Sequence, residues 1–132
     1  MTRIVQRGLG LAAVGFGVLT VISGFSVLFG GADVASLAGN VVAGVLWFNA
    51  LSGFLYVIAG VCLYRNNPFA FTLAKGLAAA IAVVFVALGW HILEGGAYEA
   101  RTVAAMTLRL GFWLAIAVYL FRKRHTATRA AP

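Results

Sequence analysis

Four long apolar segments limit what this chain can fold into more than any other feature of the sequence. They cover residues 8–31, 41–64, 69–93 and 102–121 and contain almost no charged side chains. A helix needs about 20 apolar residues to cross a bilayer, and the segments lack the two-residue alternation of a membrane β-barrel. The first segment is longer than the roughly 15-residue core of a signal peptide, so we expect an uncleaved helix. The sequence therefore predicts an all-α integral membrane protein with four transmembrane helices and a basic tail at residues 122–132.

Composition agrees with a membrane protein and excludes several function classes. Of the 132 residues, 63% are hydrophobic and 10% are charged, and no polar linker divides the chain, so we expect a single domain over residues 1–132. The net charge of +7 does not indicate nucleic-acid binding, because the basic residues lie at the ends of the apolar segments. Cys62 is the single cysteine, which excludes an intrachain disulfide.

Basic and acidic residues are separated along the chain in a way that predicts the topology. Most basic residues lie before the first segment, around the second connection and after the fourth segment: Arg3, Arg7, Arg65, Lys75, Arg122, Lys123, Arg124 and Arg129. The three acids, Asp33, Glu94 and Glu99, lie near the first and third connections. The positive-inside rule then predicts that both termini are cytoplasmic, and the short connections predict an up-down-up-down bundle. We expect the bacterial cytoplasmic (inner) membrane.

Small and polar residues repeat at helical spacing in the first two segments. In lipid, such residues mark the faces where helices pack closely, because burying apolar surface gains little there. The predicted packing stripes are Ala13, Gly17, Thr20 and Gly24 in the first segment, and Asn49, Ser52, Gly53, Tyr56 and Gly60 in the second.

Arg109 is the most informative single residue, because it lies well inside the fourth apolar segment. Arginine stays protonated, and a charge within the bilayer usually faces the bundle and is paired. By depth along the helices, we expect a candidate ligand-binding cluster near the outer side: Arg109, Glu94, His91, Asn49, Ser52 and Trp113. Ser23 lies at a similar depth, and Trp47 and Trp90 could wall the cluster. The alternative is an internal ion pair between Arg109 and Glu94, supported by Asn49, that fixes helix register and binds nothing.

These residues favour one function and leave two others open. The first is an outward-facing polar pocket for a lipid-soluble or anionic ligand, such as a quinone or lipid headgroup. The second is an accessory or assembly subunit of a larger membrane complex with no ligand of its own. The third is a haem or metal redox protein, although His91 is the only histidine within a predicted helix, so that two axial histidines would require a dimer.

The sequence lacks the residues that several other chemistries require. No catalytic residue and no metal site are predicted, no cofactor can be named, and enzymatic activity is not expected; the phosphate-loop and dinucleotide fingerprints are missing. Small multidrug antiporters need an acid inside the first helix, and this chain has none there. The expected partners are the lipid bilayer and either further copies of the chain or subunits of a membrane complex.

The opening Arg7-Gly8-Leu9, followed by Gly15, Gly17 and Gly24, resembles the start of DoxX-like bacterial membrane proteins. The chain is also similar to that family in its size and in its four predicted spans. Some members act as small subunits of quinone-linked oxidoreductases, so the resemblance implies an accessory role in the membrane.

Overall fold

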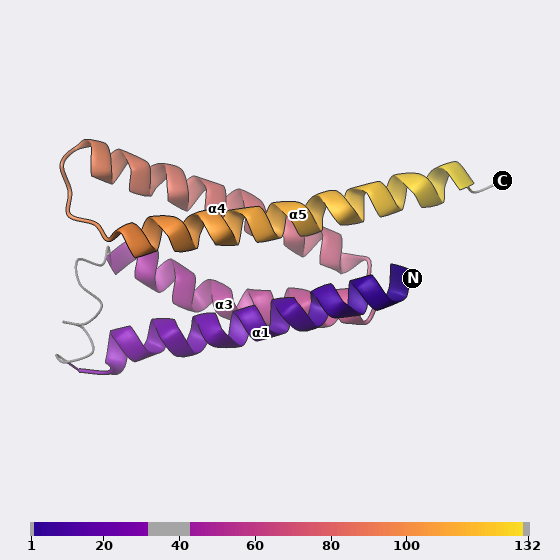
Figure 1. The fold of residues 1–132 in the computed structure, drawn as a ribbon, viewed down its shortest axis with the longest axis horizontal. Helices are drawn as coiled ribbons and strands as arrows, with labels where there is room; N and C mark the ends of the chain where they lie inside the picture. Colours follow the sequence, from indigo (N-terminus) through magenta and orange to yellow (C-terminus); the bar gives the residue numbers. More distant parts are fainter. Residues whose placement is uncertain (1, 32–42, 131–132) are drawn as a thin grey trace.

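The computed structural model describes residues 2–31 and 43–130, which form an all-α structure (Figure 1). Its helices are α1 (Thr2–Phe29), α3 (Ala43–Tyr64), α4 (Phe69–Leu93) and α5 (Ala100–Ala130). All four are long and apolar enough to cross a membrane, which confirms the predicted helical membrane architecture. The first connection, with Asp33, lies outside the described residues.

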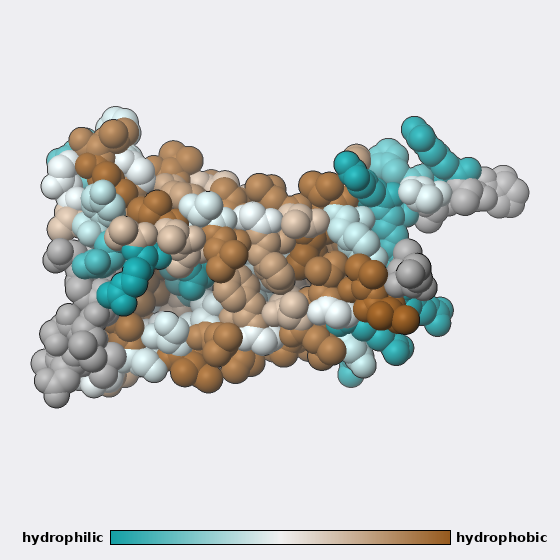
Figure 2. Space-filling view, in the orientation of Figure 1, coloured by the Kyte–Doolittle hydropathy of each residue, from teal (hydrophilic) through white to brown (hydrophobic). Residues whose placement is uncertain are grey.

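The helices are arranged as a bundle in which successive helices are neighbours. The contact between α1 and α3 is by far the most extensive, followed by α4 with α5 and α3 with α4. In Figure 1 the start of α1, the α3–α4 turn and the end of α5 lie at one end of the molecule, and the α4–α5 connection lies at the other. In Figure 2 a predominantly apolar middle separates two ends that carry the hydrophilic surface. Large apolar side chains such as Val86 point outward, as expected where lipid replaces water.

Glycines allow α1 and α3 to approach until their backbones touch. A Cβ atom on Gly17 would lie 2.7 Å from the carbonyl oxygen of Gly53, and one on Gly10 would lie 2.7 Å from that of Gly60. Gly24 is equally close to Ala50, where a Cβ would meet the alanine Cβ at 2.6 Å. The α1 glycines are seven residues apart, about two helical turns, so they lie along one face. This confirms the packing role predicted for the small-residue stripes and adds Gly10 to it.

The helix ends follow local sequence signals. Gly95 adopts a φ of 84°, and the amides of Gly95 and Gly96 donate to Ile92 and His91 carbonyls, which closes α4 with a Schellman-type cap. At the other end of α4, the Asn67 carboxamide accepts a hydrogen bond from the Phe69 amide at 2.9 Å, directly beside Pro68. Helices α1 and α5 extend beyond the predicted apolar segments, so that the basic residues 122–130 continue α5.

Candidate functional site

Arg109 lies at a cavity of about 230 Å³ between α1, α3 and α5, near the end where α4 and α5 connect. Helix α1 contributes Thr20, Ser23, Gly24 and Val27, and α3 contributes Val45, Leu46 and Asn49. The preceding connection and the first turns of α5 contribute Glu99, Arg101, Thr102, Ala105 and Arg109. The lining residues of α5 follow three- and four-residue steps, so they share one helix face with Arg109.

An aromatic cluster lies against the Arg109 side chain. The guanidinium carbon is 5.8 Å from the centroid of the Phe16 ring, within the range of a cation–π contact. Phe16 stacks on Tyr56 at 5.5 Å, and Tyr56 contacts Trp113 at 5.1 Å. Phe112 contacts both Phe16 and Trp113 edge-on at 5.3 Å. The site thus combines a polar cavity with an aromatic floor built from α1, α3 and α5.

Four polar atoms around this cavity and floor are buried without a hydrogen-bond partner in the described part of the chain: Asn49 Oδ1, Tyr56 Oη, Arg109 Nε and Trp113 Nε1. The Tyr56 hydroxyl lies beside Ser52 and Arg109, but without hydrogen-bond geometry to either. The Ser52 hydroxyl instead donates to the backbone carbonyl of Asn49 at 3.0 Å. A buried polar group without a hydrogen bond lowers stability by about 1–3 kcal/mol. Four such atoms close together therefore indicate that a hydrogen-bonding partner binds there.

These four atoms differ in whether they can donate or accept a hydrogen bond. Tyr56, Arg109 and Trp113 each carry a hydrogen that can be donated, whereas Asn49 Oδ1 can only accept. The guanidinium also carries a fixed positive charge. The buried polar atoms therefore have an excess of donors, which suits a group rich in acceptor oxygens.

The structure places His91 and Glu94 away from this cavity. The His91 imidazole Nε2 is 3.0 Å from the carbonyl oxygen of Ala97, and the ring borders a separate apolar groove between α3 and α4. Glu94 is exposed at the end of α4, and its backbone amide donates to the Trp90 carbonyl. No ion pair joins Glu94 to Arg109 in residues 2–31 and 43–130, because the cavity lies between α1, α3 and α5, whereas Glu94 caps the C-terminal end of α4.

The other site residues predicted from the sequence lie together. Asn49 and Arg109 line the cavity, Trp113 belongs to the aromatic floor, and Ser52 lies beside Tyr56 under the cavity. Of the predicted wall residues, Trp90 and Trp47 are exposed on the outer surface of the bundle.

Several residues of the site were not predicted. Phe16 and Phe112 are ordinary members of apolar segments, and only the three-residue step from Arg109 to Phe112 indicates a shared face. The same helical spacing, read backward from Arg109, does identify Thr102 as a neighbour on that face, and it would also have identified Ala105. Among the described residues, no group of three or more His, Cys, Asp and Glu side chains could hold a metal ion.

No protein-family model matches the chain, and searches of curated proteins and of solved structures give no match either. The resemblance to DoxX-like proteins therefore stays a prediction from the sequence.

Proposed function

We propose that the protein spans the bacterial cytoplasmic membrane as an up-down-up-down bundle with both termini in the cytoplasm. The positions of the termini and of the α3–α4 turn at one end of Figure 1 support this orientation, because most basic residues belong to that end. Glu94 and Glu99 belong to the α4–α5 connection at the other end. The cavity beside Arg109 then opens toward the outer side of the membrane.

We further propose that this cavity binds the acceptor-rich headgroup of a lipid-soluble ligand. The observation that carries the proposal is the excess of buried, unpaired donors around Arg109. A carboxylate, a phosphate or a quinone carbonyl supplies the acceptor oxygens that these donors lack, and a hydrogen bond to a charged group contributes about 1.5–3 kcal/mol. The fixed charge favours an anionic head, and the aromatic floor also suits a flat ring.

The volume of the cavity fits the headgroup of such a ligand but not its tail. Since one water molecule occupies about 30 Å³, a cavity of about 230 Å³ holds a small headgroup but not a long hydrocarbon chain. Because α1 and α5 both line the cavity, we expect a tail to leave it between these two helices toward the acyl chains. A ligand with a compact polar head and an apolar tail satisfies both conditions.

Mass spectrometry of the purified protein tests this proposal. We expect wild-type protein in mild detergent to retain an amphiphile that Arg109→Ala loses. The matched control is Arg129→Ala, which removes the same charge from an exposed position near the end of α5. Equal amphiphile content in Arg109→Ala and wild type would refute the proposal. A ligand-free wild-type protein extracted as a stable hetero-complex would instead favour the accessory-subunit alternative.

Fluorescence of Trp113 gives a second, more specific test. Trp113 is 1% exposed in the floor, whereas Trp47 and Trp90 are 44% and 65% exposed, so a Trp47→Phe/Trp90→Phe variant keeps only the reporter in the site. We expect ubiquinone-1 to quench Trp113 saturably and laurate to compete with it. In Arg109→Ala the affinity should fall about 10- to 100-fold, which corresponds to the loss of one charge-assisted hydrogen bond. Quenching that rises linearly without saturation would show partition into the detergent and would count against a site.

A further inference from the structure

A second polar site lies at the opposite end of the bundle, and its centre is Gln6. The Gln6 side chain is 3% exposed; its amide nitrogen donates to the Leu63 carbonyl at 3.0 Å and to the Asn66 carboxamide oxygen at 2.8 Å. The Lys123 ammonium donates to the Gln6 carboxamide oxygen, and also to that of Asn66 at 3.0 Å. This network joins α1, the α3–α4 turn and α5, so it fixes the three elements relative to one another.

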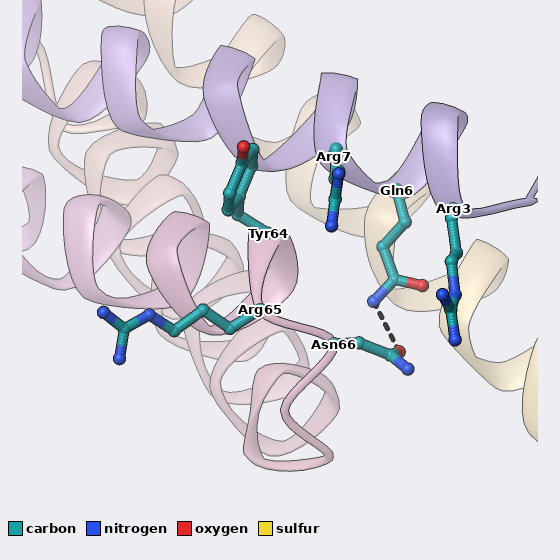
Figure 3. A pocket seen from close by; sticks show the side chains of 6 residues that line it. All are labelled: Arg3, Gln6, Arg7, Tyr64, Arg65 and Asn66. Carbon is teal, nitrogen blue, oxygen red and sulfur yellow. Dashed lines mark hydrogen bonds between the residues drawn. The ribbon is translucent and has the colours of Figure 1, made fainter.

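Beside the network is a pocket of about 350 Å³ lined by Arg3, Gln6, Arg7, Tyr64, Arg65 and Asn66. In Figure 3, Arg3, Gln6 and Arg7 point from α1 toward the end of α3, where Asn66 faces Gln6, and Arg65 extends away on the far side of Tyr64. The Arg7 guanidinium carbon is 5.4 Å from the centroid of the Tyr64 ring, which holds it over the pocket.

The pocket has a positive charge that its own residues do not neutralise. Its lining contains three arginines and no acid, and the Lys123 ammonium donates hydrogen bonds to two of the lining residues, Gln6 and Asn66. Guanidinium groups present paired donors that match the oxygens of a phosphate, and they bind it more specifically than a lysine does. Because the network holds Gln6 and Asn66 in place, the floor of the pocket is formed before any ligand binds.

The surroundings of the pocket indicate a phosphate that belongs to a lipid. Ile4, Arg7 and Leu11 follow three- and four-residue steps on α1, and Ile4 and Leu11 are exposed apolar side chains on either side of Arg7. Val61, near the end of α3, is likewise exposed and lies four residues before Arg65 in the α3–α4 turn. A lipid phosphate between the arginines would therefore place its acyl chains along apolar surface that leads into the membrane. Tyr64 lies where membrane proteins place aromatic side chains, at the level of the headgroups.

We propose that this pocket binds the phosphate group of an anionic lipid from the cytoplasmic leaflet. The site is independent of the cavity at Arg109, since the two are lined by different residues near opposite ends of α1 and α3. An anionic lipid adds a net charge that a zwitterionic lipid lacks, and a basic residue near a membrane surface attracts anionic lipid by about fivefold in affinity.

The test is native mass spectrometry of the protein titrated with phosphatidylglycerol and, separately, with phosphatidylcholine. We expect wild type to prefer phosphatidylglycerol. Arg3→Gln/Arg7→Gln should bind it more than about 25-fold more weakly, because this variant loses the hydrogen bonds of both arginines to the phosphate in addition to a roughly fivefold surface attraction from each. The control is Arg122→Gln/Arg129→Gln, which removes the same charge from exposed positions on α5. If the two double variants lose the same affinity for phosphatidylglycerol, the arginines act only by general surface attraction and the proposal is wrong.

Two further measurements separate the possible ligands and the two sites. Millimolar inorganic phosphate should leave phosphatidylglycerol binding unchanged; if phosphate displaces the lipid, the site is one for free phosphate and the lipid proposal is wrong. Arg109→Ala should keep the preference for phosphatidylglycerol, so that failure of the cavity proposal and failure of this one give different results. Loss of the preference in Arg109→Ala would contradict two independent sites.

Discussion

The glycine contacts between α1 and α3 allow a sharp test of how this bundle is held together. Gly17→Ala adds a Cβ that would lie 2.7 Å from the Gly53 carbonyl oxygen and 2.8 Å from the Val57 amide nitrogen. Both are backbone atoms, so the clash can be relieved only by moving one helix away from the other. Gly15→Ala adds the same atom two residues away on α1, where nothing lies within 4 Å.

This pair of variants isolates the cost of separating the helices. Replacing glycine by alanine favours a helix by about 1 kcal/mol, and this contribution is the same at both positions and cancels in the comparison. What remains is the overpacking at Gly17, which costs about 1–3 kcal/mol in a well-packed interior. We therefore expect Gly17→Ala to have a free energy of unfolding about 1–3 kcal/mol lower than that of Gly15→Ala.

The assay is reversible unfolding in mixed micelles with increasing dodecyl sulfate, followed by circular dichroism and analysed by linear extrapolation. Gly53→Ala provides a check from the partner helix, because its Cβ would lie 3.0 Å from the Gly17 carbonyl oxygen. The double variant should cost less than the sum of the two, since one separation relieves both clashes. Equal stability of Gly17→Ala and Gly15→Ala would refute the close packing of α1 on α3.

Three shorter predictions test the Gln6 network, the orientation in the membrane and whether Glu94 contributes to the cavity. Lys123→Met removes both hydrogen bonds to the network and should lower the free energy of unfolding by about 1–3 kcal/mol in the same assay. In a Cys62→Ser background, a membrane-impermeant maleimide added to intact spheroplasts should label Tyr98→Cys and not Arg129→Cys; the reverse pattern would invert the proposed orientation. Glu94→Gln should leave the retained amphiphile unchanged, because this side chain is exposed and does not line the cavity; a loss would show that Glu94 reaches the ligand.

Much of the fold could be predicted because it depends on signals contained within each segment. Apolar length gives the helices, Gly95 ends α4 by adopting a positive φ, and the spacing of Gly17 and Gly24 identifies a close contact. Each of these is a property of one helix or one turn, so a single sequence is enough to identify it.

The site was less predictable because it depends on which helices face one another. Position along a segment gives Arg109 and Glu94 similar depths, but not the rotation of α4 relative to α5, and the structure turns Arg109 toward α1 and α3. The Gln6 network was missed for a related reason. Gln6 precedes the first apolar segment and Lys123 follows the last, and their meeting requires α1 and α5 to continue as helices beyond the membrane-spanning residues.

Residues at similar depths of α1, α3 and α5 form successive layers, and the order of these layers determines whether the two polar sites are connected. Thr20, Asn49 and Arg109 form a polar layer at the cavity, and Phe16, Tyr56 and Trp113 form the aromatic layer beneath it. Ala13, Ala59 and Ile116 are buried beyond that layer, and Leu63 and the Gln6 network follow.

The two middle layers separate the two polar sites. In the described part of the chain, Tyr56, Trp113, Leu63 and Ile116 lie between the cavity and the basic pocket, and all four are almost fully buried. A polar solute crossing between them would have to displace a packed aromatic layer and its neighbours, and interiors of this kind are not continuously deformable. The layered interior therefore favours two separate binding sites, one for each side of the membrane, over a path through the bundle.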